Sequence, residues 1–246
     1  MSEATPTVVL VHGAFADASS WSGVIERLQA KGIPVTAPAN PLRGISFDSA
    51  YLASVFEQIE GPVLAVSHSY GGAVITNAAN DAKNVVGLVY VAAFAPDEGE
   101  TLGAAEASSK DSVLNSALVP RHYPGANGAT ATEFYIDPAK ARDAFAGDLS
   151  DEQAALIAAT QRPVADAAFG EPNGAPAWKH LPSWAVVATG DRAAGTDVVR
   201  SMAERAGAKI TEIEGSHVIM VSQPEAVSKV ILEAVAAAAA VPAGTA

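Results

Sequence analysis

The stretch PVLAVSHSYGG, residues 62–72, decides the fold of this chain. Its apolar run ends abruptly in small residues and the helix-like AVITNAAN follows, so it predicts a strand, a very tight turn and a helix. Ser69 lies at the turn, between Ser67 and a pair of glycines. A nucleophile on such a strained turn needs small neighbours, because the backbones come so close that a Cβ would clash. Taken alone, the stretch also fits an ordinary turn with a serine that caps the helix.

Apolar runs and helical patterns alternate on both sides of this turn. Four apolar runs separated by helical patterns predict the strands of a buried parallel sheet, at residues 7–11, 33–37, 63–67 and 85–94. The alternation resumes late in the chain with strands at 184–188 and 209–213, a helix over about 196–205 and a last helix from about 224. Because parallel neighbours need right-handed crossovers, we expect helices on both faces of the sheet.

Capping residues place the start of two helices. Asp48 or Ser49 is expected to cap a helix that runs to about residue 60. Ser150 and Gln153 have the spacing of a capping box, which predicts a helix over residues 150–160.

Residues 96–181 interrupt the alternation. They hold Gly, Pro and Ala with scattered short helical patterns, and an insertion of this size after a sheet strand is typical of a cap over the site. We therefore expect a core made of residues 1–95 and 182–246, with 96–181 as the cap. No internal repeat or linker splits off a second independent domain.

Composition excludes several classes of function. The formal net charge is −12 and no basic run occurs, so neither nucleic acid nor an anionic membrane is an expected partner. The absence of cysteine excludes disulfides, thiolate metal sites and a cysteine nucleophile, and no metal site of another kind is predicted. The first residues, MSEATPT, do not resemble a secretory signal, and no apolar stretch is long enough to span a membrane. We expect a cytoplasmic protein, either a monomer or a homodimer.

A serine nucleophile needs a base that takes its proton and a group that orients that base. Among the five histidines, His217 follows the last predicted strand and comes after Ser69 in the chain. Loops at the carboxyl ends of parallel strands meet at one edge of the sheet, where the turn of Ser69 also opens. We therefore expect His217 to be the general base, His68 to pack in the interior and His12 to be structural in its loop.

The orienting acid is expected at Asp191, which follows the strand at 184–188 through a tight turn at Gly190. Two other carboxylates compete for this role. Asp197 lies near a helix N-terminus, where the helix dipole already explains an acidic residue. Asp97 follows the fourth predicted strand.

The oxyanion that forms during attack on a carbonyl needs at least two N–H donors. We expect one from Tyr70, the residue after the nucleophile, and one from Ala14, in the loop after the first strand. Gly13 allows this loop to turn toward Ser69. Phe15 and Phe94 are expected to line the substrate pocket, although plain core packing explains each of them equally well. The sequence leaves open whether three aromatic residues of the insertion face the site or solvent: Tyr123, Phe134 and Trp178.

Together these motifs resemble those of the α/β-hydrolase superfamily. Residues 67–71 are similar to its nucleophile elbow, G-x-S-x-G, with Ser67 in place of the first glycine, and the order Ser69, Asp191, His217 is that of its triad. VVLVHGAFADASSW, AVSHSYGG and VYVAAFAPDEGE look most like the small branch that includes plant methyl esterases and hydroxynitrile lyases. The resemblance implies an α/β fold with a six-stranded, mostly parallel sheet, helices on both of its faces, a helical cap after the fourth strand and no cofactor.

The resemblance also implies a serine hydrolase that cleaves small to medium carboxylic esters through an acyl-enzyme. Two alternatives remain, a C–C lyase of the hydroxynitrile lyase type and a non-catalytic homologue that binds a ligand. The lyases of this branch carry Thr where this chain has Gly13, and Lys where it has Val218. Both differences favour a hydrolase acting on a small-molecule ester.

Overall fold

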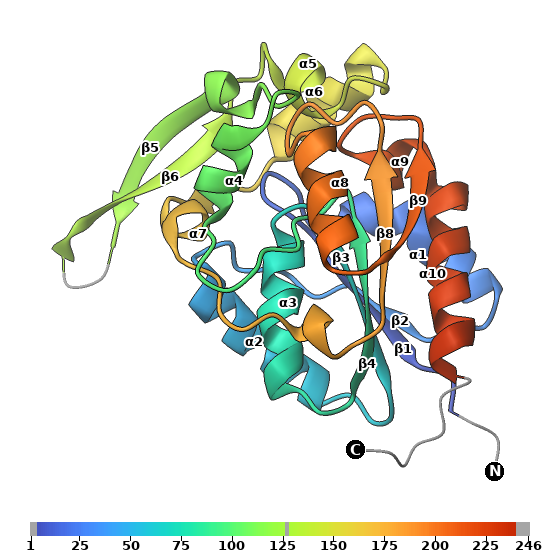
Figure 1. Cartoon of the computed structure of the whole chain (residues 1–246). Coiled ribbons are helices and arrows are strands. Elements are labelled where there is room, and N and C mark those ends of the chain that lie inside the picture. Colours follow the sequence, from blue (N-terminus) through green and yellow to red (C-terminus); the bar gives the residue numbers. More distant parts are fainter. Residues whose placement is uncertain (1–3, 126–127, 240–246) are drawn as a thin grey trace.

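The computed structural model describes residues 4–125 and 128–239, and its centre is a six-stranded sheet (Figure 1). Every pair of neighbouring strands in this sheet is parallel, in the order β2-β1-β3-β4-β8-β9. The bounds are β1 (Thr7–Val11), β2 (Val35–Thr36), β3 (Val63–His68), β4 (Val85–Val91), β8 (Ser183–Ala188) and β9 (Lys209–Ile213). The predicted parallel sheet is thus confirmed, although β2, at the edge of the sheet, is shorter than predicted.

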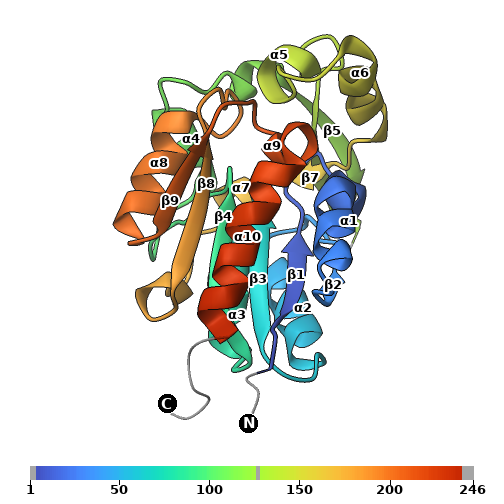
Figure 2. The same ribbon diagram turned by 90° about the vertical axis from the view of Figure 1, so that its right-hand side faces the viewer.

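Helices cover both faces of the sheet, as predicted (Figures 1 and 2). One face carries α1 (Ser22–Ala30) and α10 (Pro224–Ala239), and the other carries α2 (Ile45–Glu57), α3 (Gly71–Asp81) and α8 (Thr196–Arg205). Right-handed crossovers require this division, because the chain moves one way along the sheet through α1 and the opposite way through α2, α3 and α8. The short helices η1 (Ala18–Trp21) and α9 (Ile219–Ser222) complete this part. None of the helices in the described ranges has the length and apolar character that crossing a bilayer requires.

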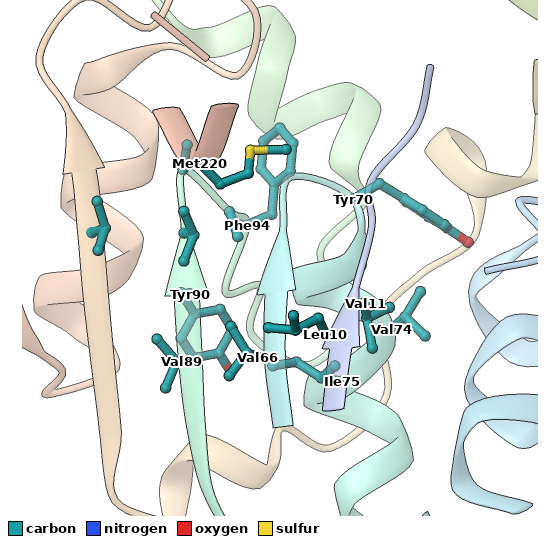
Figure 3. Packing of buried hydrophobic residues seen from close by; sticks show 14 of the residues in the cluster. Leu10, Val11, Val66, Tyr70, Val74, Ile75, Val89, Tyr90, Phe94 and Met220 are labelled. Carbon is teal, nitrogen blue, oxygen red and sulfur yellow. The ribbon is translucent and has the colours of Figure 1, made fainter. Parts of the chain in front are cut away.

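The core is built on the central strands. Leu10, Val66 and Val89 pair across β1, β3 and β4, and all three side chains are fully buried (Figure 3). Each such side chain contributes about 1.5–3 kcal/mol through burial. The burial of these strands on both faces explains their continuous apolar sequences.

The two predicted helix starts have different outcomes. The capping box of Ser150 and Gln153 is present at the start of α6 (Asp151–Thr160), as predicted. The predicted cap at Asp48 or Ser49 is wrong, because α2 begins at Ile45, with Gly44 as its N-cap. The Asp48 carboxylate instead reaches back to the turn before the helix, where it accepts the backbone N–H of Arg43 at 3.1 Å.

The insertion combines helices with a second sheet. Its helices are α4 (Leu102–Ser108), η2 (Leu114–Ala117), α5 (Ala141–Phe145), α6, α7 (Ala167–Gly170) and η4 (Ala177–Lys179). The sequence predicts only the helical part, but β5 (Leu118–Pro124), β6 (Thr130–Ile136) and β7 (Val164–Ala165) form an antiparallel sheet. The β5–β6 hairpin projects away from the body of the protein (Figure 1). Strand β5 escapes prediction because it contains two prolines, which weaken any strand pattern and are tolerated at sheet edges.

Candidate active site

Ser69 lies on a strained turn between β3 and α3. Its φ of 53° is in the left-handed region, which costs free energy for any residue except glycine. The surroundings hold this conformation, because the Ser69 carbonyl oxygen accepts the N–H of Gly72 at 2.9 Å and that of Phe94 at 3.2 Å. Helix α3 and the segment after β4 therefore fix the turn from two sides.

Close approach of three backbone segments explains the glycines around this turn. A Cβ at position 71 would lie 2.7 Å from the carbonyl oxygen of Val11, and one at position 72 would collide with the carbonyl oxygen of Phe94. A Cβ at position 13 would lie 2.6 Å from Cβ of Ser69. Distances under 3.0 Å force the backbone to move, so all three positions require glycine in this arrangement.

Ser67 replaces a glycine of the usual elbow pattern without leaving a buried polar group unpaired. Its side chain is fully buried, and its hydroxyl donates a hydrogen bond to the carbonyl oxygen of Val89 at 3.2 Å. A buried hydroxyl with a partner avoids most of the desolvation cost. The neighbouring strand β4 therefore accommodates this departure from the pattern.

His217 and Asp191 form a buried pair. Nδ1 of His217 lies 2.7 Å from Oδ2 of Asp191, and both side chains are 1% exposed. The other carboxylate oxygen, Oδ1, accepts the backbone N–H groups of Ala193 at 2.9 Å and Ala194 at 3.0 Å. With Nδ1–H donating to Asp191, the second ring nitrogen, Nε2, keeps its lone pair available to accept a proton.

The two competing acids are engaged elsewhere. Asp97 forms an ion pair with Lys179 at 2.6 Å, and Asp197 accepts the backbone N–H of Lys110 at 2.8 Å. Neither forms a hydrogen bond with His217 in the described part of the chain. Within the same ranges, no three His, Asp or Glu side chains lie where they could hold a metal ion together.

The residues predicted for the site border one cavity, whose volume is about 10 Å³. Of the predicted site residues, all but Asp191 line it: Ala14, Phe15, Ser69, Tyr70, Phe94 and His217. Asp191 lies behind the lining and contacts His217. No described residue forms a hydrogen bond with Oγ of Ser69, so this hydroxyl borders the cavity without a protein partner. A cavity of this volume holds about one water molecule, and a substrate therefore requires the side chains above it to move.

Two residues that line this cavity have backbone N–H groups without an acceptor. Ala14 lies in the turn after β1, and Tyr70 is the N-cap residue of α3. Among the described residues, neither N–H donates a hydrogen bond to a protein acceptor. The positive end of the α3 dipole also lies at Tyr70, which favours negative charge there.

The side chain of Tyr70 anchors the turn to α2. Its hydroxyl donates to Oδ2 of Asp48 at 2.7 Å, and the ring extends away from Phe94 (Figure 3). Burial raises the pKa of the Asp48 carboxyl, and the hydrogen bond from Tyr70 opposes this shift. Burial next to this carboxylate also raises the pKa of the Tyr70 hydroxyl, so it stays protonated. The buried pair thus holds the backbone of Tyr70 in place.

His68 packs directly beside His217. The two ring centroids are 4.6 Å apart, and Nε2–H of His68 donates to the carbonyl oxygen of His217 at 3.0 Å. Burial holds the pKa of His68 well below its usual range, so the ring is neutral. His68 therefore supports the loop of His217 through this hydrogen bond as well as through the packing that the sequence predicts.

His12 holds the loop after β1. Its Nδ1–H donates to the carbonyl oxygen of Gly13 at 2.9 Å, and its Nε2 accepts the backbone N–H of Asn40 at 2.9 Å. Burial lowers the pKa of His12 to about 4. Both ring nitrogens are engaged, which agrees with the structural role expected for this residue.

Several residues of the cavity come from the cap and carry no signal in the sequence. Phe145, at the end of α5, places its ring centroid 5.1 Å from that of His217 and 6.1 Å from that of Phe15. The other cap residues of the lining are Glu106, Leu114 and Phe169. No local pattern marks them, because only the folding of the insertion over the sheet brings them to Ser69.

The three aromatic residues left open by the sequence do not line this cavity. Trp178 is buried and its Nε1–H donates to the carbonyl oxygen of Pro96 at 3.1 Å. Tyr123 lies under the guanidinium of Arg43, and Phe134 packs against Phe169. Phe134 thus does not line the cavity, but it packs against Phe169, which does.

The sequence matches a family model described as "Alpha/beta hydrolase family" over residues 8–230. That match spans both parts of the core and the whole insertion between them. No curated protein matches the chain by sequence.

Several solved structures share this fold with the chain. Polyneuridine aldehyde esterase is 22% identical, with a TM-score of 0.79 over 94% of this chain and 99% of its own. A pyrethroid hydrolase from Sphingobium faniae JZ-2 is 20% identical, with a TM-score of 0.76 over 94% and 98% of the two chains. An extracellular alpha/beta-hydrolase from a Paenibacillus species, described as sharing structural and functional homology with Tobacco Salicylic Acid Binding Protein 2, is 19% identical, with a TM-score of 0.74 over 93% and 98%. At these identities the likeness establishes the shared fold.

Proposed function

Because the chain belongs to the alpha/beta hydrolase family, we propose that it is a serine hydrolase of the branch that resembles plant esterases. Its proposed substrates are small to medium carboxylic esters, cleaved through an acyl-enzyme. One observation carries the proposal: Ser69 with its free hydroxyl, His217 with its paired imidazole, and two residues whose backbone N–H groups have no acceptor in the described ranges, Ala14 and Tyr70, border one cavity. Ester hydrolysis in general agrees with the family and with the activities named for the structural neighbours.

In the proposed mechanism, Ser69 attacks the ester carbonyl while Nε2 of His217 takes its proton. Asp191 keeps the imidazole in the tautomer with the proton on Nδ1 and stabilises the imidazolium that forms. His217 then gives the proton to the departing alkoxide, which leaves as the alcohol. A water molecule, activated by the same imidazole, hydrolyses the acyl-enzyme and releases the acid.

The N–H groups of Ala14 and Tyr70 are proposed to bind the oxyanion. They are fixed before the substrate arrives, since the glycine contacts and the hydrogen bond from Tyr70 to Asp48 hold both turns. Donors that need no rearrangement stabilise the transition state more than the ground state, and each is typically worth about 2.7–4 kcal/mol.

Two positions weigh against the lyase alternative. The space for a Cβ at position 13 is taken by Ser69, so a threonine does not fit there without a backbone shift. Val218, the residue after His217, is buried and its side chain is uncharged, so it supplies no cation to the cavity. The non-catalytic alternative has no support from the His217–Asp191 geometry, which would serve no purpose in a simple binding site.

The test is the Ser69→Ala variant assayed with p-nitrophenyl acetate and butyrate. We expect loss of turnover by at least about 10³-fold, with unchanged thermal stability. Ser54→Ala, on the exposed face of α2, is the matched control and keeps full activity. A fluorophosphonate probe should label the wild type at Ser69 and leave the variant unlabelled. Undiminished turnover in Ser69→Ala would refute the proposal, and cyanide release from mandelonitrile would favour the lyase.

A further inference from the structure

Glu106 is the one acidic side chain that borders the cavity of Ser69 in the described part of the chain. It lies on α4 in the cap and is only 6% exposed. Apart from Ser69, Tyr70 and His217, the rest of the lining is apolar: Ala14, Phe15, Phe94, Leu114, Phe145, Phe169 and Ala194. A carboxylate in such surroundings must be compensated by hydrogen bonds or by a positive charge.

The protein compensates this carboxylate incompletely. Oε1 lies 2.5 Å from Oγ of Ser112, and Oε2 accepts a hydrogen bond from the side-chain amide of Asn115. Oγ of Ser112 is also 2.6 Å from the carbonyl oxygen of Ala193, and its single hydrogen can serve only one of these two acceptors. A carboxylate can accept about four hydrogen bonds, so Glu106 keeps capacity for a further donor.

No protein cation completes the site. In the ranges that the structure describes, no Lys, Arg or His side chain forms an ion pair with Glu106. Four phenylalanine rings border the same cavity, and the face of an aromatic ring attracts a cation that has lost its water. A carboxylate without a protein cation and several aromatic rings together suit an organic ammonium group, because the carboxylate pairs with its charge and the ring faces attract it.

We propose that the substrates of this site are esters that carry an ammonium group, and that Glu106 binds this group. The inference rests on the proposed function, because it assigns the substrate class of the same cavity. The ammonium supplies the missing donor and the missing charge together, whereas a neutral ester leaves the carboxylate partly unpaired. Glu106 is thus a specificity residue, distinct from the residues that carry out the reaction.

Paired esters that differ only in charge test this preference. The first pair is β-alanine methyl ester, which carries the charge on its acyl side, and the neutral methyl butanoate. The second pair is acetylcholine, which carries the charge on its alcohol side, and the neutral 3,3-dimethylbutyl acetate. In at least one pair, the charged-to-neutral ratio of kcat/KM should be high in the wild type and fall at least about tenfold in Glu106→Gln. Glutamine suits the test because its amide can still accept from Asn115 and donate to Ser112.

Glu204→Gln is the matched control, since Glu204 is exposed on α8 and the substitution changes the net charge by the same amount. A general attraction of cations to an acidic protein would lower the ratio equally in both variants, and that result would overturn the inference. Equal ratios in the wild type and in Glu106→Gln for both pairs would overturn it as well.

Binding to the Ser69→Ala variant separates this inference from the proposed function. NMR titration with both pairs should show that, in at least one pair, the charged ester binds at least about tenfold more tightly than its neutral partner, and that adding Glu106→Gln removes the difference. If the wild type hydrolyses no ester, the proposed function fails while this binding preference stands. Equal binding of charged and neutral esters to Ser69→Ala in both pairs, or no binding of any of them, overturns the inference whatever the turnover.

Discussion

The turn that carries Ser69 and the cap segment that carries Phe145 border the same cavity, but different contacts hold them. At the turn, atoms from the end of β1, the start of α3 and the segment after β4 lie so close together that a single extra carbon does not fit. The cap segment meets the core through side chains, including an ion pair between Asp143 and Arg192 and a hydrogen bond from Ser216 to Asp148. The proposed chemistry therefore depends on the turn, whose backbone cannot adjust easily. The shape of the cavity depends on the cap segment, whose side-chain contacts can adjust.

The largest expected effect comes from Asp191→Asn, which changes the core side of the cavity without changing its shape. Asparagine can turn its amide N–H toward Nδ1 of His217, and this favours the wrong tautomer of the imidazole. We expect kcat to fall about 10³–10⁴-fold, with little change in KM. Asp197→Asn, on α8, is the control and should keep kcat. A loss of less than tenfold in Asp191→Asn would contradict the role assigned to this pair.

Gly72→Ala tests the crowding at the turn directly. The new Cβ would meet the carbonyl oxygen of Phe94, which belongs to the backbone and cannot turn aside. We expect the free energy of unfolding to fall by at least about 3 kcal/mol, measured by urea denaturation. Gly170→Ala in the cap is the matched control, since nothing lies within 4 Å of its Cβ. Similar stabilities of the two variants would show that the turn tolerates more than this geometry allows.

The same contrast explains how much the sequence could predict. Residues 62–72 encode the strand, turn and helix locally, and the rule that parallel strands end at one edge brings His217 and Asp191 near Ser69. Each step uses neighbours in the chain or in the sheet. The fold of the core and the arrangement of the candidate site could therefore be inferred before any coordinates.

The cap residues could not be found in this way. Phe145 and Glu106 reach the cavity through tertiary packing of short helices, and nothing in their own segments marks them. Asp48 misled for a related reason, since its position suits a helix cap while its carboxylate binds Arg43 and Tyr70. Where a side chain acts through a distant partner, the local pattern contains no record of it.

The buried side chain of His12, in the loop after β1, should make the stability of the protein depend on pH. Burial lowers the pKa of His12 in the core to about 4, below the usual value of about 6.5. Between these values the unfolded chain binds a proton that the folded protein does not, so the free energy of unfolding falls as the pH falls. The slope for this one group approaches about 1.4 kcal/mol per pH unit.

This slope can be measured by urea denaturation between pH 6.5 and 5. His12→Gln should be less stable at pH 7, because contacts with Asn40 change, but its stability should depend less on pH. His122→Gln, on the exposed strand β5, is the control and should keep the slope of the wild type. His68, whose pKa is also lowered by burial, adds to the slope of both proteins, so an unchanged slope in His12→Gln would contradict the lowered pKa of His12.

Phe145→Ala tests the adjustable side of the cavity. Removing this ring, which packs against His217 and Phe15, makes room next to Ser69, so kcat/KM should rise for esters with longer acyl chains. We expect the ratio of kcat/KM for p-nitrophenyl hexanoate over acetate to rise at least about tenfold, since a single methylene newly accommodated is already worth about that much. Phe47→Ala is the control, because Phe47 is 62% exposed on α2. If activity falls with both esters and the ratio of their kcat/KM values does not change, Phe145 supports His217 and does not select substrates.

The smallest effect is expected from Asp143→Asn, which removes the ion pair between α5 and Arg192. Both side chains are largely exposed, at 68% and 48%, so water and salt screen their attraction. We expect a loss of no more than about 0.5–1 kcal/mol in the free energy of unfolding, and the loss should disappear in 1 M NaCl. A larger loss of unfolding free energy that does not depend on salt would show that this ion pair holds the cap firmly against the loop of Asp191. The cap would then be held as firmly as the turn, and the contrast between the two regions would no longer stand.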